Sequence, residues 1–208
     1  MIDKLQSWSP KKTAQLEDIL RDYLHVEQMD ERLRRAAVLI PLYQVEGRLH
    51  AVFIERTRYF RDDGKEAPHS GQVAFPGGKQ EDGESLKQTA IREAYEETAL
   101  LPERLHMLGE LGTLLTYGSF FRTSVFVSWL EKPPILTPDA HEVAAIHHVP
   151  LWQIVDQHKP GLDLERRIDL LNIHYHWQTG NRQAQICIWG MTGRVVWLLF
   201  ELLRRIKS

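Results

Sequence analysis

The pattern of apolar and polar positions predicts a layered domain of strands and helices. Leucine and isoleucine residues at helical spacing predict an amphipathic helix within residues 10–35. Two apolar runs at 36–44 and 47–57 have the character of strands, and the glycine between them favours a hairpin. Residues 58–71 are polar and interrupted by glycine and proline, so we expect a long loop of the kind that often carries function.

The second half of the chain continues this mixture. A short strand ends at Pro76, a Gly-Gly turn follows, and helical periodicity then runs over residues 85–100. Residues 158–183 are polar, and we expect them to be irregular. The remaining expected elements are strands at 105–116, 121–131, 142–149 and 185–191 and helices at 150–157 and 192–207. This order indicates an α/β or α+β layered fold, with a domain at 36–208 and a helical extension at 1–35.

Composition narrows the function classes. The 208 residues fit one domain with a terminal extension, and 26 Lys and Arg nearly balance 28 Asp and Glu, so no basic field predicts a nucleic-acid partner. Cys187 is the lone cysteine, which excludes a disulfide framework and a thiolate metal cage. The sequence has no secretory signal and no apolar run that would span a membrane, so we expect a cytoplasmic protein without a membrane partner.

Three acids share one face of the helix predicted at 85–100. Glu93, Glu96 and Glu97 stand at helical spacing, where like charges repel. The plain alternative is a solvated helix face, but little positive charge is interleaved among these acids. The glycines before the helix can also bring a backbone carbonyl close to them. Hard oxygen ligands in this arrangement suit Mg²⁺ or Mn²⁺, which leads to the hypothesis that a cation offsets the repulsion.

The charged positions resemble the signature of the Nudix hydrolase family, G-x5-E-x7-R-E-U-x-E-E-x-G-U, where U is a bulky apolar residue. Gly78, Glu84 and Arg92 match its first half, and the three acids match its second half. Two positions depart from the pattern: Ala94 is smaller than the usual apolar residue, and Ala99 replaces the final glycine. The metal-binding acids are intact, so the departures leave the expected chemistry in place.

A longer segment resembles the coenzyme A pyrophosphatase branch of that family. The run HSGQVAFPGG at 69–78 matches its extended pattern, and the segments EVAAIHHVPL at 142–151 and IWGMTGRVVWLL at 188–199 resemble two others. The expected L-L-T-x-R-S appears only loosely, as FIERTR at 53–58, and the loop after it is longer than in the branch. Contacts with coenzyme A are expected in this part of the chain.

The resemblance implies an α/β/α sandwich around a mixed sheet and assigns roles to the site residues. The carbonyl of Gly77 and the three acids would bind Mg²⁺ or Mn²⁺, and one acid of the helix or Glu142 would take a proton from the attacking water. Arg92, paired with Glu84 or Glu97, would orient the acids. The catalytic candidates are thus Arg92, Glu93, Glu96, Glu97 and Glu142, with Gly78 and Glu84 as structural support.

The resemblance also implies a substrate of the coenzyme A type. Hydrolysis would give 4′-phosphopantetheine and adenosine 3′,5′-bisphosphate. His69 and Gln72 lie in the matching run, and Arg58, Arg61 and Lys65 form a basic cluster that could contact the 3′-phosphate. A solvated loop is the alternative for this cluster.

Two other functions remain open from the sequence. One is a Nudix enzyme acting on ADP-ribose, NADH or oxidised nucleotides, and the other is a Nudix-fold binding module without catalysis. Such modules typically lose the acids of the signature, and all of them are present here. A homodimer is also left open.

Overall fold

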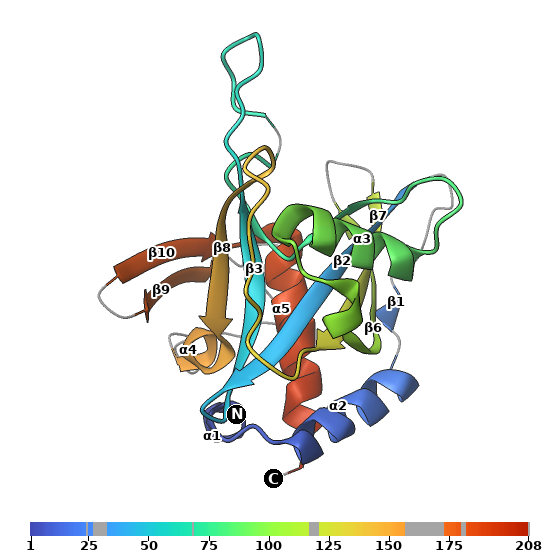
Figure 1. Ribbon diagram of the computed structural model, residues 1–208, viewed down its shortest axis with the longest axis vertical. Helices are drawn as coiled ribbons and strands as arrows, with labels where there is room; N and C mark the ends of the chain where they lie inside the picture. The colour runs from blue at the N-terminus through green and yellow to red at the C-terminus, as the bar shows by residue number, and fades with distance from the viewer. Residues whose placement is uncertain are drawn as a thin grey trace.

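The computed structural model in Figure 1 describes residues 1–23, 25–26, 33–67, 69–116, 121–156, 173–179 and 182–207. Its helices are α1 (Ile2–Gln6), α2 (Pro10–Asp22), α3 (Leu86–Thr98), α4 (Leu151–Asp156) and α5 (Gly190–Arg205), with a 3-10 turn η1 (Pro102–Arg104). Its strands are β1 (His25–Val26), β2 (Arg34–Val45), β3 (Arg48–Arg56), β4 (Val73–Ala74), β5 (Gly77–Lys79), β6 (His106–Thr116), β7 (Phe121–Trp129), β8 (Val143–Pro150), β9 (Ile173–Thr179) and β10 (Arg182–Ile188).

The described strands form one large mixed sheet and one small antiparallel sheet. The path of the large sheet is β1-β6-β7-β2-β3-β4, with β5 paired to β2 and β8 paired to β3. β2 runs parallel to β7, and β1 runs parallel to β6, whereas the other pairs in this sheet are antiparallel. β9 and β10 pair separately. The predicted mixed sheet and the predicted hairpin of β2 with β3 are confirmed.

Helices cover both faces of the large sheet, as Figure 1 shows for α3 and α5. Alternate residues of β2 point to opposite faces, so Leu39 packs in a cluster with Ala90 of α3, while Ile40 packs in a cluster with Leu199 of α5. Burying a leucine or isoleucine side chain contributes about 1.5–3 kcal/mol, so both layers are held by apolar contacts with the sheet. The predicted α/β/α sandwich is confirmed.

The N-terminal helix is shorter than the sequence predicts. α2 ends at Asp22, where Tyr23 takes an extended backbone conformation, and β1 then pairs with β6. The sequence predicts a helix through residue 35, and this is wrong for residues 25–26 and 34–35, which are strand. Pairing within the sheet satisfies the backbone N–H and C=O groups of these residues. Leu16 and Leu20 of α2 pack in the same core cluster as α5. The domain division at residue 35 stays a prediction.

The glycines before α3 form a strand and not the predicted turn. Gly77 pairs with Val38, and Gly78 pairs with Ala37, in the antiparallel contact of β5 with β2. A Cβ atom on Gly77 would lie 2.4 Å from the carbonyl oxygen of Ala37, so only glycine fits where the two backbones come together. The close approach, rather than a change of direction, is what requires glycine at this position.

The C-terminal region contains more strand than expected. Residues 173–179 form β9, which corrects the prediction of an irregular segment there, while residues 157–172 and 180–181 lie outside the described residues. The expected helices at 150–157 and 192–207 are present as α4 and α5. Among the described residues, no helix combines the length and apolar character needed to cross a membrane.

The long loop predicted at 58–71 is present and stands out from the body of the protein in Figure 1. It leaves β3, returns to β4 and is closed by a single bridge between Phe60 and Glu66. We call residues 57–67 and 69–71 the arm. The arm meets the body where β3 pairs with β4, and this places its base next to the site described below.

Candidate active site

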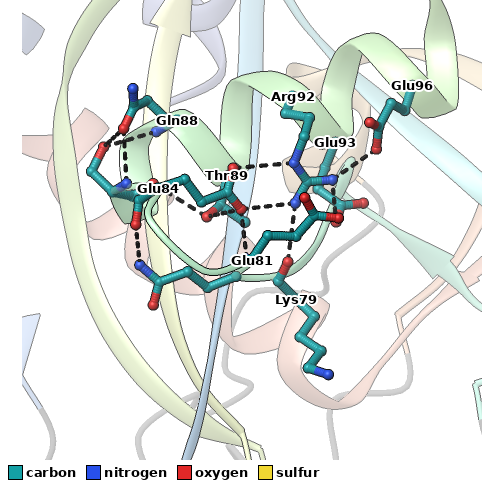
Figure 2. Close-up of polar contacts among 10 residues, drawn as sticks. Lys79, Glu81, Glu84, Gln88, Thr89, Arg92, Glu93 and Glu96 are labelled. Atoms are coloured by element: carbon teal, nitrogen blue, oxygen red, sulfur yellow. Dashed lines mark hydrogen bonds and ion pairs between the residues drawn. The ribbon is translucent and has the colours of Figure 1, made fainter.

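The start of α3 is fixed by a network of side chains. Ser85 is the N-cap, and its side chain and that of Gln88 form a capping box. Glu84 accepts hydrogen bonds from the backbone N–H of Glu81 and from the hydroxyl of Thr89, both at 2.8 Å. Figure 2 shows these contacts around the first turn of the helix. The first N–H groups of a helix have no partner within the helix, and the capping box supplies partners at this end. These contacts fix the residue at which α3 begins.

Arg92 joins the helix to the preceding segment. Its guanidinium donates to Glu84 through Nε at 3.1 Å and Nη2 at 2.9 Å, and Nη2 also donates to the carbonyl of Lys79 at 3.1 Å (Figure 2). The hydrogen bond from Arg92 is the main reason that the pKa of Glu84 falls to about 2. The expected pairing of Arg92 with Glu84 is therefore present, and it holds the carboxylate in its ionised form.

Arg92 also contacts two of the three clustered acids. Its Nη1 donates to Glu96 at 2.8 Å and lies 3.1 Å from Glu93, and these contacts offset part of their mutual repulsion (Figure 2). Glu93 lies against the backbone of Gly78, where an added Cβ would come within 2.4 Å of its carboxyl carbon. Burial raises the pKa of Glu93, and the charge of Arg92 opposes that rise. Gly78 thus leaves the space that this carboxylate occupies.

Glu97 has a different environment, because its side chain is buried. One carboxylate oxygen accepts the N–H of Gly77 at 2.8 Å, and the other accepts a long contact from Arg56 at 3.5 Å. Burial raises the pKa of Glu97 to about 8, the Gly77 N–H and Arg56 oppose the rise, and the charges of Glu93 and Glu142 add to it. The expected alternative pairing of Glu97 with Arg92 gives way to pairing with Arg56, a residue that the sequence analysis missed.

The three clustered acids of α3 are of the ligand type that a divalent cation prefers. Glu93, Glu96 and Glu97 offer hard carboxylate oxygens, and the glycine backbone at Gly78 leaves room for Glu93. Within the described part of the chain, however, no three carboxylate, imidazole or thiolate side chains converge as metal ligands do. Arg92 draws Glu93 and Glu96 toward its guanidinium, while Glu97 faces Gly77. The residues that would hold an ion are thus the same ones that Arg92 and Gly77 contact.

A pocket of about 230 Å³ opens beside the acids, at the base of the arm. Its lining comes from the end of β3, from the arm and from the start of β8: Arg56, Thr57, Tyr59, Ala67, His69, Ser70 and Glu142. Arg56 belongs both to this pocket and to the ion pair with Glu97. The pocket therefore lies one side chain away from a buried acid of α3.

The structure separates the five candidate substrate residues. His69 lines the pocket, and its Nδ1 lies 3.1 Å from the side-chain oxygen of Gln72, so these two are brought together. Arg58 packs against Gly71, and Arg61 forms an ion pair with Asp63 at 3.5 Å. The three basic residues Arg58, Arg61 and Lys65 are exposed and do not line the pocket. Their contact with a 3′-phosphate stays a prediction.

Glu142 lies at the start of β8, exposed to solvent and in the wall of the pocket. Its carbonyl accepts the N–H of Thr57 at 2.9 Å, which joins it to the base of the arm. Its charge raises the pKa of both Glu93 and Glu97, so it acts electrostatically on the acids of α3. Its role as the general base stays a prediction.

Similarity to known proteins covers most of the chain. The family model described as the NUDIX domain matches residues 33–169. A protein of Yersinia pestis (strain Pestoides F), described as an uncharacterized Nudix hydrolase NudL, is 32% identical over 166 residues, which cover 78% of this chain and 76% of that protein. The NudL protein of Yersinia pseudotuberculosis serotype O:1b has the same identity and coverage.

A solved structure shares the fold at low sequence identity. The crystal structure of a MutT/nudix family protein from Enterococcus faecalis superposes with a TM-score of 0.55 at 14% identity, covering 86% of this chain and 65% of that one. At this identity the likeness concerns the fold alone, and it agrees with the mixed sheet between two helical layers described above.

Proposed function

Since the chain belongs to the Nudix family of hydrolases, we propose that it is a divalent-metal-dependent pyrophosphohydrolase that cleaves the diphosphate bond of coenzyme A or one of its derivatives. The observation that carries the proposal is Glu97, a buried carboxylate on α3 whose partner Arg56 also lines an open pocket. A hydrolase of diphosphates needs acids beside a substrate site, and these residues meet that need. The run at 69–78 supports coenzyme A in particular.

The acids of α3 would hold the cation. Glu93, Glu96 and Glu97 are the residues for Mg²⁺ or Mn²⁺, and a bound ion of this kind neutralises phosphate charge and lowers the pKa of a bound water. Gly77 keeps Glu97 in place through its N–H, and Gly78 leaves room for Glu93. Arg92, anchored on Glu84, fixes the direction from which Glu93 and Glu96 approach.

A carboxylate would take the proton as water attacks phosphorus. Glu142 suits this role because it is exposed in the pocket wall, where a substrate-bound water could reach it. An acid of α3 is the alternative. The water oxygen forms a bond to one phosphorus of the diphosphate, the bridging oxygen leaves with the other phosphorus, and the proton passes to the carboxylate. For coenzyme A, the products are 4′-phosphopantetheine and adenosine 3′,5′-bisphosphate.

The proposal includes a cytoplasmic location and a small nucleotide-type substrate as the sole expected partner, with a homodimer left to measurement. A panel of substrates with product identification tests the reaction. It contains coenzyme A, dephospho-coenzyme A, an acyl-coenzyme A, ADP-ribose, NADH and 8-oxo-dGTP, each with Mg²⁺ and with Mn²⁺. We expect coenzyme A compounds to be cleaved at the diphosphate with the highest kcat/KM.

The panel separates the alternatives by outcome. Cleavage of ADP-ribose or NADH without cleavage of coenzyme A would overturn the substrate assignment and leave the pyrophosphohydrolase chemistry. No cleavage of any compound with either metal would favour a binding module without catalysis. A Glu97→Gln variant serves as the control for a contaminating hydrolase, because activity that survives this change unaltered does not come from the proposed site.

A further inference from the structure

The arm is ordered by contacts within itself and exposes two aromatic side chains. The N–H of Ala67 donates to the carbonyl of Tyr59 at 2.8 Å, and the N–H of Tyr59 donates to the hydroxyl of Ser70 at 2.8 Å. Tyr59 is 50% exposed and Phe60 is 67% exposed. Of these two neighbours only Tyr59 lines the pocket. Tyr59 therefore belongs to the pocket lining while half of its surface stays exposed.

The size of the pocket limits what it can hold. Pockets that enclose a whole drug-sized ligand measure about 300–1,000 Å³. The present pocket of about 230 Å³ is smaller and would take one end of a larger molecule. Its lining combines an aromatic residue, Tyr59, with the polar residues Thr57, His69, Ser70 and Glu142. A flat ring with donors and acceptors along its edge matches this lining better than a flexible chain does.

The backbone of His69 supports a binding role. Its φ is +65°, in the left-handed region that is uncommon for residues other than glycine. Its side chain contacts that of Gln72, and the residue lines the pocket. Backbone strain of this kind is kept where surrounding contacts hold the residue in place, and residues with such strain cluster at ligand sites.

The position of Arg56 relates the pocket to the acids of α3. Arg56 lines the pocket on one side and contacts Glu97 on the other. A ring placed in the pocket would therefore direct an attached phosphate past Arg56 and toward the acids of α3. In adenosine diphosphate compounds the ring, sugar and diphosphate follow one another in that order.

We propose that this pocket binds the adenine ring of the substrate and that Tyr59 is the surface on which the ring stacks. The inference rests on the proposed function, because it assigns one end of the substrate to one side of the acids. It concerns a feature shared by coenzyme A and ADP-ribose, so it holds for either substrate. Stacking of a base on an aromatic side chain is tolerant of sequence context and survives partial exposure to solvent.

Steady-state kinetics of three variants test the inference. Tyr59→Ala is expected to raise KM about tenfold for coenzyme A, dephospho-coenzyme A and ADP-ribose alike, with kcat changed less than about twofold. Tyr59→Phe keeps the ring and is expected to restore KM to within about twofold of wild type. Phe60→Ala is the matched control, since Phe60 is the adjacent and more exposed aromatic residue of the same arm and lies outside the pocket.

The KM changes of the three substrates show which end of the substrate the pocket binds. A KM rise for the two coenzyme A compounds without a rise for ADP-ribose would assign the pocket to the pantetheine end and overturn the proposal. An unchanged KM for all three, or an equal loss in Phe60→Ala, would also overturn it. Unchanged melting temperatures in all variants are required before the comparison is made.

Binding of AMP separates this inference from the proposed function, because it needs no hydrolysis. Isothermal titration calorimetry of AMP is expected to give a Kd about tenfold weaker in Tyr59→Ala than in wild type. If wild type bound AMP in this way but cleaved none of the panel, the proposed function would fail and the adenine site would stand. If wild type cleaved coenzyme A while AMP bound equally to both proteins, the adenine site alone would fail.

Discussion

The strand–helix unit of β5 and α3 and the arm lie next to each other and are built in opposite ways. Ala90 and Ala94 bury one side of α3 against the sheet, and Glu97 is 1% exposed. The arm bonds mainly to itself and leaves residues 58–66 exposed. The sequence matches the family signature closely in the first region, whereas the loop of the arm is longer than in the coenzyme A pyrophosphatase branch.

The roles proposed for the two regions account for this difference. Carboxylates that act on a diphosphate must be held in a fixed position, and a displacement of about 1 Å can lower a rate about 100-fold. A packed helix with a determined register provides that position. A surface that holds one end of a substrate can be exposed, since ring stacking tolerates water. We therefore expect changes in α3 and β5 to act on kcat and changes in the arm to act on KM.

The largest expected effect is that of Glu97→Gln. The variant keeps the size of the side chain but cannot ionise, so it offers no carboxylate to Gly77, Arg56 or a bound cation. We expect kcat to fall about 10³-fold, corresponding to about 4 kcal/mol of transition-state stabilisation, at saturating Mg²⁺. Glu103→Gln, an exposed acid in η1, is the control. More than half of wild-type activity in Glu97→Gln would remove Glu97 from the site.

Gly78→Ala tests whether the position of Glu93 matters. The new Cβ would lie within 2.5 Å of both carboxylate oxygens of Glu93, so this flexible side chain must move aside. We expect kcat to fall about 100-fold with little loss of stability. Gly83→Ala is the matched control: its Cβ meets nothing within 4 Å, but its φ is +84°. That control should lose about 1 kcal/mol of stability and keep its kcat, and equal kcat in the two variants would contradict the role of Gly78.

A divalent cation is expected to stabilise the folded protein, because it relieves repulsion among acids that are clustered only after folding. At a free Mg²⁺ or Mn²⁺ concentration of about 100 times Kd, the gain is about 2.7 kcal/mol, or roughly 5–10 °C in Tm. Differential scanning fluorimetry with each metal and with EDTA measures it. The Glu93→Gln/Glu97→Gln double variant should show no such gain, and a gain equal to that of wild type would mean that the ion binds elsewhere.

The smallest expected effect is that of Ala99→Gly. Ala99 is the C-cap of α3 with φ of +55°, a conformation that glycine adopts without steric cost. We expect the free energy of unfolding to rise by about 0.5–1 kcal/mol, measured as a higher urea midpoint with an unchanged m value. Ala94→Gly, the same substitution in the buried interior of α3, should have the opposite sign. A loss of stability in Ala99→Gly would show that the left-handed cap carries no strain.

The sequence predicts the contacts within α3 because they depend on local spacing. The expected pairing of Arg92 with Glu84 needs only two helical turns, and it is present. The placement of Gly78 and the clustered acids on one strand–helix unit follows from the same local rules. The expected layers also follow from apolar alternation along β2, since that strand meets helices on both faces.

Contacts between distant segments were harder to predict. Arg56 stands 41 residues before Glu97, and the two side chains meet only in the folded protein. A signal was available, because Arg56 ends an apolar strand where a charge needs a buried partner. The strand role of Gly77 depends on the backbone of β2, which spacing does not reveal. β9 was missed because its polar residues concealed the alternation of Ile173, Tyr175 and Trp177.

The way in which the arm is attached has a consequence for how such enzymes diversify. It leaves and rejoins the sheet at paired positions, Ile54 with Ala74 and Glu55 with Val73. Segments inserted between two paired strand ends cost only about 0.6 kcal/mol for each doubling of length. The arm can therefore change in length or sequence between these two residue pairs without a change in the contacts of α3. If the arm binds the substrate as proposed, substrate recognition can change through the arm while the acids of α3 stay in place.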